Sequence, residues 1–508
     1  MSTAWAIDPD APSLAALFER AVEAFPDGEG VVHDETRLTY AQWWQHAGGL
    51  AEELRRRGVR PGDVVIIGLP SSAEYAVAYV AIARLGAVAS GVNPRLGSGE
   101  IAHVLAKTDP AAIICGTDLL DRIPPDYRDR VLPVEDFPRF VGTEPGPVAA
   151  VEADAPAVIV WTSGTTGLPK GAWFDTNGLR ASALGSRDFV RPFDRRLVPL
   201  PFVHAGFMTK VWEIVASGTT LVITPVPWRA AVMLDLIERE RITVATGVPT
   251  QWEKVMSLPD VVDRDLSALR YVITSTAPAS PELIRRLEDG LRVEVAVRFA
   301  STESGPATGT RPGDAPDVVS TTLGRPLPDA EISIVDDDGV ALPAGAIGTV
   351  RVRHPGRMRG YWRDPEQTAK TLSLDGWITT GDLGWLTDDG NLVLTGRSTE
   401  MYIRGGYNVY PREVELALLD HPSVRDAAVL GMPAPVIGEQ GVAVLVPEDP
   451  DAPPTLEEVR DFLRGRIADY KLPDVLCVVP ELPLTAFMKV SRPELRTIAE
   501  QHLQGHSP

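Results

Sequence analysis

Hydrophobic residues in the first two thirds of the chain gather in short β-branched runs that alternate with longer stretches of helical pattern. The run VVIIGL at residues 64–69 is followed by a Ser-Ser pair and an apolar-rich stretch over residues 73–85. Further short runs occupy residues 111–115, 157–161, 219–224, 242–246 and 269–274, and helical stretches occupy residues 230–241 and 281–289. Strands that alternate with helices predict parallel sheets covered by helices on both faces.

The pattern changes from about residue 329 onward. Alternating segments at residues 331–335, 348–353 and 392–395 are joined by Asp-Asp-Gly turns, which predicts antiparallel hairpins. Beyond Gly396 a smaller α/β unit is expected, with helices over residues 411–420 and 455–468 and strands over residues 424–430 and 441–446. The acidic, proline-rich segment 447–455 predicts a surface loop.

Composition and charge narrow the function classes. The chain has 508 residues, of which 44% are hydrophobic, and a formal net charge of -20. This charge argues against nucleic acid or an anionic membrane as the main partner. The two cysteines, Cys115 and Cys477, form no CxxC pair and predict neither a disulfide framework nor a zinc site. With no visible signal peptide and no apolar run of the ~20 residues that span a bilayer, a soluble, cytoplasmic protein is expected.

The most informative segment is WTSGTTGLPKG, residues 161–171, which directly follows the predicted strand AVIV. Its glycines allow close backbone approach, its hydroxyls can donate hydrogen bonds, and Lys170 adds a point charge. A strand followed by such a loop is typical of a phosphate-binding site. The spacing matches neither a Walker loop nor the GxGxxG pattern, and the alternative is a polar turn between two strands.

The segment from Ser163 to Gly171 resembles the signature loop of the adenylate-forming superfamily, which contains acyl-CoA synthetases, firefly-type luciferases and peptide-synthetase adenylation domains. Other motifs in the same order extend the resemblance over nearly the whole chain. They are LTYAQ at 38–42, RLGAVASGVNPRL at 84–96, GVPT at 247–250, STESG at 301–305, TTGDLG at 379–384 and GRSTEMYIRGGYNVYPREVE at 396–415.

The resemblance implies an α/β fold with a large N-terminal part, made of two α/β sheet subdomains and a distorted β-barrel, and a small mobile C-terminal α/β lid. It places the N-terminal domain at residues 1–396, a hinge at 397–400 with Thr399 as its pivot, and the lid at 401–508. A rotation of the lid would assemble one site at a time. A monomer or a homodimer is expected.

The family's reaction has two halves, and the resemblance implies both. A carboxylate attacks the α-phosphorus of ATP to give an acyl-adenylate and pyrophosphate, and a second nucleophile, usually the thiol of coenzyme A, then displaces AMP. The expected partners are therefore a small carboxylic acid, ATP, Mg²⁺ and coenzyme A. Fixed donors and a divalent ion would stabilise the developing charge on the phosphates.

The resemblance also assigns site residues, by position. Thr302 would bond the α-phosphate, Glu303 would bind Mg²⁺, and the mobile Lys489 would reach the forming acyl phosphate. Residues expected around ATP or AMP are Thr162, Ser163, Gly164, Thr165, Thr166, Gly167, Lys170, Ser275, Thr276, Ala277, Phe299, Ala300, Ser301, Thr302, Asp382 and Arg397. The acyl pocket is expected at His204, Gly247, Ser275 and Gly305, and the coenzyme A tunnel at Gly405, Gly406 and Tyr407. Simpler interpretations are a satisfied core histidine for His204, a surface lysine for Lys489 and a plain hairpin turn for the paired glycines.

Several positions depart from the family pattern. Phe299 and Ala300 replace the usual Tyr-Gly, so an adenine can still stack but the phenol hydroxyl is lost. Thr399 replaces the usual Asp or Lys of the hinge, and Met488 replaces the glycine before the catalytic lysine. The usual Gly-Gly-Ala-Pro wall is Ser-Thr-Ala-Pro at residues 275–278, and its hydroxyls could bond a polar substrate.

Three hypotheses follow. The first is an AMP-forming acid–CoA ligase acting on an aryl or medium-length carboxylate. The second is an adenylate-forming enzyme with another acceptor, either an amine that gives an amide or nitrite in an ATP-dependent diazotase. The third, a non-catalytic adenylate-binding or scaffold protein, is disfavoured because Lys170, Glu303, Asp382 and Lys489 are all present.

Overall fold

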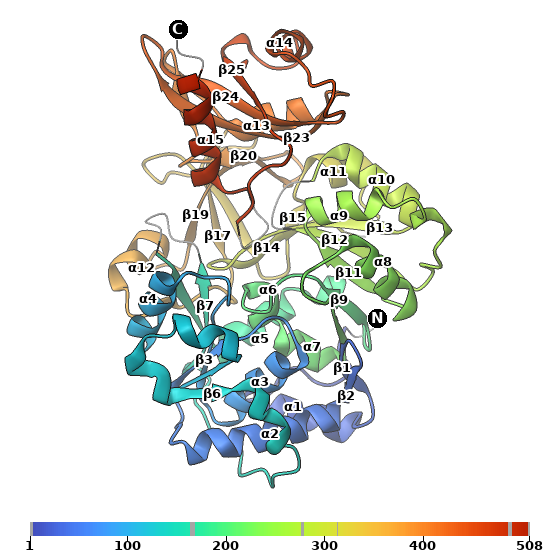
Figure 1. The fold of residues 1–508 in the computed structure, drawn as a ribbon, viewed down its shortest axis with the longest axis vertical. Coiled ribbons are helices and arrows are strands. Elements are labelled where there is room, and N and C mark those ends of the chain that lie inside the picture. The colour runs from blue at the N-terminus through green and yellow to red at the C-terminus, as the bar shows by residue number, and fades with distance from the viewer. Residues whose placement is uncertain (1–3, 163–167, 276–278, 312, 486–489, 506–508) are drawn as a thin grey trace. The chain divides into compact units, whose positions relative to one another are not determined.

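The computed structural model describes residues 4–162, 168–275, 279–311, 313–485 and 490–505. The chain divides into two compact units, and Figure 1 shows their helices and strands. The first unit comprises Met1–Ile332 and Val352–Ile378, and the second comprises Ser333–Arg351 and Thr379–Pro508.

A nine-stranded sheet forms one half of the first unit, in the order β15-β14-β13-β12-β11-β9-β10-β1-β2. Its strands are β1 (Glu29–His33), β2 (Thr36–Thr39), β9 (Arg195–Val198), β10 (Thr220–Ile223), β11 (Val244–Gly247), β12 (Tyr271–Ser275), β13 (Glu294–Ser301), β14 (Gly305–Gly309) and β15 (Arg325–Pro326). The strands from β1 to β13 in this order are parallel, whereas β2, β14 and β15 pair antiparallel at the two edges. Helices α8 (Ala230–Arg239), α9 (Pro249–Met256) and α10 (Pro281–Leu291) pack their apolar faces against it (Figure 1).

A seven-stranded sheet forms the other half of the first unit, in the order β18-β8-β7-β4-β3-β5-β6. Its strands are β3 (Val64–Gly68), β4 (Val88–Gly91), β5 (Ala112–Cys115), β6 (Val131–Pro133), β7 (Pro156–Thr162), β8 (Lys170–Asp175) and β18 (Gly360–Tyr361). Strands β3 to β7 are parallel, and β8 turns back antiparallel to β7. The helices around it include α1 (Leu14–Ala24), α2 (Tyr40–Arg56), α3 (Ala73–Arg84), α4 (Ser98–Thr108) and α5 (Thr176–Leu184).

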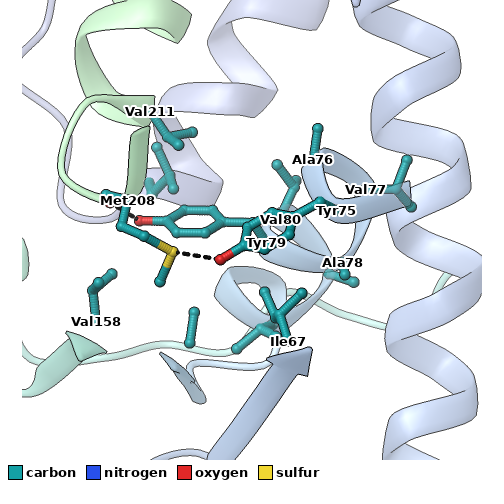
Figure 2. Close-up of a cluster of buried hydrophobic side chains, with 14 of the residues drawn as sticks. Ile67, Tyr75, Ala76, Val77, Ala78, Tyr79, Val80, Val158, Met208 and Val211 are labelled. Atoms are coloured by element: carbon teal, nitrogen blue, oxygen red, sulfur yellow. Dashed lines mark hydrogen bonds between the residues drawn. The ribbon is translucent and has the colours of Figure 1, made fainter. Parts of the chain in front are cut away.

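The core of this half is built around α3, a helix that is apolar on nearly all sides and correspondingly buried. Figure 2 shows two of its tyrosines pointing at Met208. The Tyr79 hydroxyl donates to the Met208 carbonyl at 2.6 Å, and the Tyr75 hydroxyl lies 2.9 Å from the Met208 sulfur. These contacts hold the short helix α6 (Ala205–Met208), which His204 precedes, and the following helix α7 (Val211–Ser217) packs into the same core.

The second unit contains two sheets. The first has four strands in the order β16-β17-β19-β20, with bounds β16 (Glu331–Val335), β17 (Gly348–Arg353), β19 (Ile378–Leu386) and β20 (Leu392–Arg397). The C-terminal sheet comprises β21 (Tyr402–Arg404), β22 (Tyr407–Val409), β23 (Val424–Ala434), β24 (Gly438–Pro447) and β25 (Val475–Val478). Helices α13 (Pro411–Leu419), α14 (Leu456–Leu463) and α15 (Arg492–Gly505) contribute to its two apolar clusters.

The fold class predicted from the sequence is confirmed, and most predicted strands and helices differ from the observed ones by a few residues at their ends. One prediction is wrong in length: the helix expected over residues 455–468 ends at Leu463. Arg464 is extended and Gly465 has a φ of 78°, which ends the helix although the polar pattern continues. Strands β16, β17 and β19 belong largely to the second unit, together with the C-terminal residues. The domain boundary expected at Gly396 stays a prediction. No helix in the described part of the chain is long and apolar enough to cross a membrane.

Candidate active site

The two ends of the signature loop are held next to each other. Thr162 closes β7 and Lys170 opens β8, and the two residues are paired directly across the antiparallel ladder. Both side chains are half-buried. The residues at the two ends of the loop are therefore held together at one point of the sheet. Its residues Ser163, Gly164, Thr165, Thr166 and Gly167 lie outside the described residues.

Glu303 lies beside this point, in the tight connection from β13 to β14. The Ser301 and Ser304 hydroxyls bond each other's backbone N–H groups and close the turn. Glu303 itself is held by the Met358 N–H, which donates to the Glu303 carbonyl at 2.9 Å. The Thr162 hydroxyl lies 3.5 Å from Glu303 Oε1. The carboxylate predicted to bind Mg²⁺ is thus brought to the base of the predicted phosphate loop, and Thr302 is half-buried next to it.

Gly305 is required by this connection. Its φ is 70°, and a Cβ there would stand 2.8 Å from the Gly356 carbonyl oxygen. A side chain would therefore combine left-handed backbone strain with a backbone clash. The predicted role of Gly305 as a wall of the acyl pocket stays a prediction, because this packing alone explains the glycine.

Two residues that the sequence did not single out complete this group. The Tyr361 hydroxyl donates to Glu303 Oε1 at 2.9 Å, and the Lys170 ammonium donates to Gln367 Oε1 at 2.9 Å. Lys170 Nζ also lies 5.5 Å from the centre of the Tyr361 ring. Burial, followed by the charge of Glu303, raises the pKa of Tyr361, so the phenol stays protonated and acts as a donor.

The local sequence explains how these two residues are placed. Tyr361 ends β18, which pairs with β8 so that Tyr361 stands opposite Ala172. Asp364 then caps α12 (Pro365–Thr371), with its carboxylate accepting from the Gln367 N–H at 3.1 Å, and a proline occupies the first turn. The only sequence signal was this Asp-Pro helix start, which indicates a helix but not what the helix contacts.

The four residues expected around the acyl group lie near the carboxyl ends of the parallel strands of the nine-stranded sheet. Gly247 and Ser275 end the neighbouring parallel strands β11 and β12, and Gly305 pairs with Ser301 where β13 turns into β14. His204 follows β9, the strand on the other side of β11. Ligands of open parallel sheets bind outside the carboxyl ends of the strands, so this arrangement is consistent with the expected pocket.

Gly247 also has a packing reason to be small. A Cβ at this position would stand 2.7 Å from Nε1 of the fully buried Trp252.

Of the residues expected at the adenine, Phe299 is half-buried and Ala300 is exposed on β13. Thr276 and Ala277 lie outside the described residues.

The second unit brings together the two residues expected at the ribose. Asp382 on β19 and Arg397 on β20 are directly paired across the antiparallel ladder, and Arg397 Nε donates to Asp382 Oδ1 at 2.9 Å. The Asp382 side chain is 7% exposed and the Arg397 side chain is 54% exposed. The buried Asp382 carboxylate is therefore an acceptor that is fixed in position, and the solvent-facing Arg397 guanidinium is a donor beside it.

The hinge and tunnel predictions fall on two turns of the same unit. Thr399 is exposed in the turn after β20, which is closed by N–H groups donating to the Arg397 carbonyl. Gly405 and Gly406 have φ values of 57° and 87° and form the two-residue loop between β21 and β22, as in a type I′ hairpin. Tyr407 is 58% exposed and stacks on Tyr470 at 4.6 Å. The hinge and tunnel roles remain predictions, and Met488 and Lys489 lie outside the described residues.

The chain matches the models of two protein families. Residues 18–362 match the model of the AMP-binding enzyme family, and residues 413–489 match the model of the AMP-binding enzyme C-terminal domain. The first match covers more than half of the chain and includes Thr162, Lys170, Glu303 and Tyr361.

Individual relatives match over almost their full length. A propanoyl:CoA ligase of Mycobacterium tuberculosis, whose acyl group carries a 7a-methyl-1,5-dioxo-octahydroindenyl ring system, is 35% identical over 96% of this chain and 99% of its own. The structure of ATP-bound MatB from Rhodopseudomonas palustris is 28% identical, with a TM-score of 0.87 over 95% of this chain and 98% of its own. The amide bond synthetase McbA from Marinactinospora thermotolerans is 30% identical, with a TM-score of 0.85 over 95% of this chain and 99% of its own. The chain belongs to the AMP-binding enzyme family, within the adenylate-forming superfamily, and is most like an acid–CoA ligase.

Proposed function

We propose that the protein is an ATP-dependent, AMP-forming acid–CoA ligase. It joins a carboxylic acid to the α-phosphate of ATP, releases pyrophosphate, and then transfers the acyl group to the thiol of coenzyme A. The observation that carries this proposal is the convergence of Thr162, Lys170 and Glu303 at the base of the signature loop, in a chain most like acid–CoA ligases.

The first unit supplies the phosphate chemistry. Lys170 donates to phosphate oxygens in place of Gln367, and Thr302 bonds the α-phosphate. Glu303 holds Mg²⁺ with the Thr162 hydroxyl close by. Among the described residues no group of three or more His, Cys, Asp or Glu is arranged to hold a metal ion. A single carboxylate suits Mg²⁺, which keeps several waters and shares its coordination with substrate phosphates. When bound, the ion offsets charge on the phosphates.

The second unit supplies the nucleoside contacts and the lysine of the first half-reaction. Asp382 accepts from the ribose hydroxyls, and its geometry is kept by Arg397. Lys489 bridges the acid's carboxylate and the α-phosphate as a point charge on a long stem. The lid, residues 401–508, turns about Thr399 between the two half-reactions and brings Gly405, Gly406 and Tyr407 to the pantetheine arm. Conversion of one site into another by domain closure is common in such enzymes.

The acid lies at the sheet edge lined by His204, Gly247, Ser275 and Gly305. The similarity to a ligase for an oxygenated bicyclic propanoic acid supports an acid with a carbon skeleton larger than acetate. Such an acid would be adenylated only if its carboxylate can reach Thr302 and the α-phosphate, so the depth of this pocket selects the chain length.

A second acceptor has one specific observation in its favour. The structure of an amide bond synthetase matches this chain over 95% of its length at 30% identity. In that alternative the adenylation half is unchanged and an amine replaces coenzyme A as the nucleophile.

The adenylation half is tested by acid-dependent exchange of labelled pyrophosphate into ATP, with aliphatic, aryl and ring-bearing propanoic acids. We expect exchange with at least one acid and a loss of at least 100-fold in Glu303→Gln. The exposed turn variant Asp388→Asn is the matched control, since it removes one carboxylate far from any proposed contact. Exchange that is equal in Glu303→Gln and the unmodified protein would contradict the assigned site.

A further inference from the structure

A cluster of largely buried charged side chains lies in the first unit, on segments that adjoin residues expected at the acyl pocket. Lys210, Arg196 and Arg298 contribute three cations, and Glu213 contributes a carboxylate. Arg196 forms an ion pair with Glu213 Oε1, and Lys210 Nζ lies 3.3 Å from Glu213 Oε2. The Glu213 side chain is only 1% exposed, and those of Lys210 and Arg196 are 19% and 16% exposed.

Two of the cations converge on a single oxygen. The Lys210 ammonium and Arg298 Nη2 both donate to the Ser186 hydroxyl, the latter at 3.2 Å. Ser186 is fully buried and in turn donates to the Ser182 carbonyl. The two positive groups thus meet at a neutral acceptor, and among the described residues only Lys210 also bonds a carboxylate, that of Glu213.

The cluster carries more positive charge than the described residues neutralise. Glu213 is the one described carboxylate bonded to these cations, and Asp188 acts on Arg298 only as a distant charge. Arg196 Nε is also buried without a hydrogen-bond partner among the described residues. Buried positive charge that is only partly neutralised is costly, whereas a bound carboxylate would give Lys210 and Arg298 a further charged acceptor.

The position of the cluster relates it to the acid. Lys210 follows His204 by one short helix, and its N–H donates to the Phe207 carbonyl. Arg298 precedes Ser301 on β13, and Ser301 pairs with Gly305. Arg298 lies three residues before Ser301 along this strand, a distance on the order of 10 Å. Lys210 and Arg298 therefore lie close in sequence to the expected acyl site, one on the segment after His204 and the other on the strand that pairs with Gly305.

We infer that the acid substrate carries a second carboxylate at its far end, which Lys210 and Arg298 bind. The inference rests on the proposed function and names its substrate class: dicarboxylic acids that are activated at one end. The remote carboxylate supplies the negative charge that the cluster lacks, and its binding sets which carboxylate faces ATP. An acid that ends in a methyl group would leave Arg298 without a carboxylate partner and would make no polar contact at its own far end.

The test compares straight-chain α,ω-dicarboxylic acids of six to twelve carbons with methyl-ended acids and ω-keto acids of equal length. The readout is kcat/KM for pyrophosphate exchange by the unmodified enzyme. We expect the best dicarboxylic acid to exceed its methyl-ended counterpart at least tenfold, and the keto acid to lie close to the methyl-ended one. Lys210→Gln, which keeps a hydrogen-bond donor but removes the charge, should lower the ratio of dicarboxylic to methyl-ended acid at least tenfold.

Arg353→Gln is the matched control, because Arg353 pairs with Glu331 on the surface, and its ratio should equal that of the unmodified enzyme. The inference is overturned if methyl-ended acids exchange as well as dicarboxylic acids, or if keto acids equal the dicarboxylic acids, since then a neutral acceptor suffices. The panel on the unmodified enzyme decides this even if Lys210→Gln does not fold. Absence of exchange with every acid would instead contradict the proposed function itself.

Discussion

The Tyr361 hydroxyl donates a hydrogen bond of 2.9 Å to Glu303 Oε1, the carboxylate proposed to hold Mg²⁺. The two residues come from different sheets of the first unit, since Tyr361 ends β18 and Glu303 joins β13 to β14. The same carboxylate oxygen lies 3.5 Å from the Thr162 hydroxyl. One oxygen of Glu303 is thus oriented by two neutral donors, which leaves Oε2 as the oxygen available for a metal ion.

Tyr361→Phe should weaken the binding of Mg–ATP without unfolding the protein. The variant removes one hydrogen bond to a charged group, an interaction of about 1.5–3 kcal/mol. We expect KM for Mg–ATP to rise about tenfold or more, with a smaller change in kcat. The rise should become smaller at high Mg²⁺ concentration. Tyr407→Phe, at an exposed and stacked tyrosine of the second unit, should leave KM for Mg–ATP unchanged. An equal effect of both variants would contradict the role of Tyr361.

Gln367→Glu should impair ATP binding through Lys170. The present amide accepts from the ammonium at 2.9 Å, and a carboxylate there would form an ion pair that competes with the phosphates. KM for ATP should rise at least fivefold, whereas Gln367→Leu should change it less than twofold. Steady-state pyrophosphate exchange at several ATP concentrations measures KM for ATP in both variants. If Gln367→Glu matches Gln367→Leu, Lys170 is not the phosphate ligand.

Stability in acid should depend on Glu213. Burial alone would raise its pKa, but the charges of Lys210 and Arg196 outweigh burial and lower the pKa to about 2 from its usual 4.5. Between these two values the unfolded chain binds the proton and the folded chain does not. The carboxylate therefore contributes stability above pH 4.5, and this contribution is lost as the pH falls toward 2.

Denaturant titrations from pH 6 to pH 2.5 test this dependence. Glu213→Gln should lower the free energy of unfolding at pH 6 by about 3–5 kcal/mol, because it leaves buried cations without their carboxylate. The difference from the unmodified protein should shrink as the pH falls. A constant difference across this pH range would show that the carboxylate charge is not what stabilises the cluster.

Lys489→Ala should separate the two half-reactions. The lysine is proposed to act only while the carboxylate attacks ATP, so acid-dependent pyrophosphate exchange should fall at least 100-fold. Transfer from a supplied acyl-adenylate to coenzyme A should change less than threefold. Arg496→Ala, on the C-terminal helix α15, is a matched control for loss of a cation in the same segment. If Lys489→Ala lowers the rates of both half-reactions equally, Lys489 does not act in the first half-reaction alone, and its assignment is wrong.

The parts of the site that are contiguous in sequence could be predicted from it. Thr162 and Lys170 flank one loop, and the pairing of β7 with β8 places them together as the motif requires. Asp382 and Arg397 were also expected together, and the hairpin of β19 and β20 pairs them directly.

Contacts that depend on tertiary register could not be predicted in this way. Tyr361 reaches Glu303 only because β18 adds to the edge of β8, a pairing of two residues with no pattern of its own. The buried cluster at Lys210 is likewise invisible in sequence, since its charged residues come from β9, α7, β13 and the connection before α7. The overlong prediction for α14 has a local cause, because a left-handed Gly465 stops a helix whose polar pattern continues.

The chain is proposed to form a thioester from a carboxylic acid, ATP and coenzyme A. The most direct measurement is AMP release with each accepted acid, with and without coenzyme A and with an amine or nitrite in its place, followed by mass analysis of the product. We expect AMP release to require coenzyme A and to yield one acyl-CoA for each AMP. AMP release that requires an amine or nitrite instead, with no thioester formed, would contradict it while leaving the adenylation site in place.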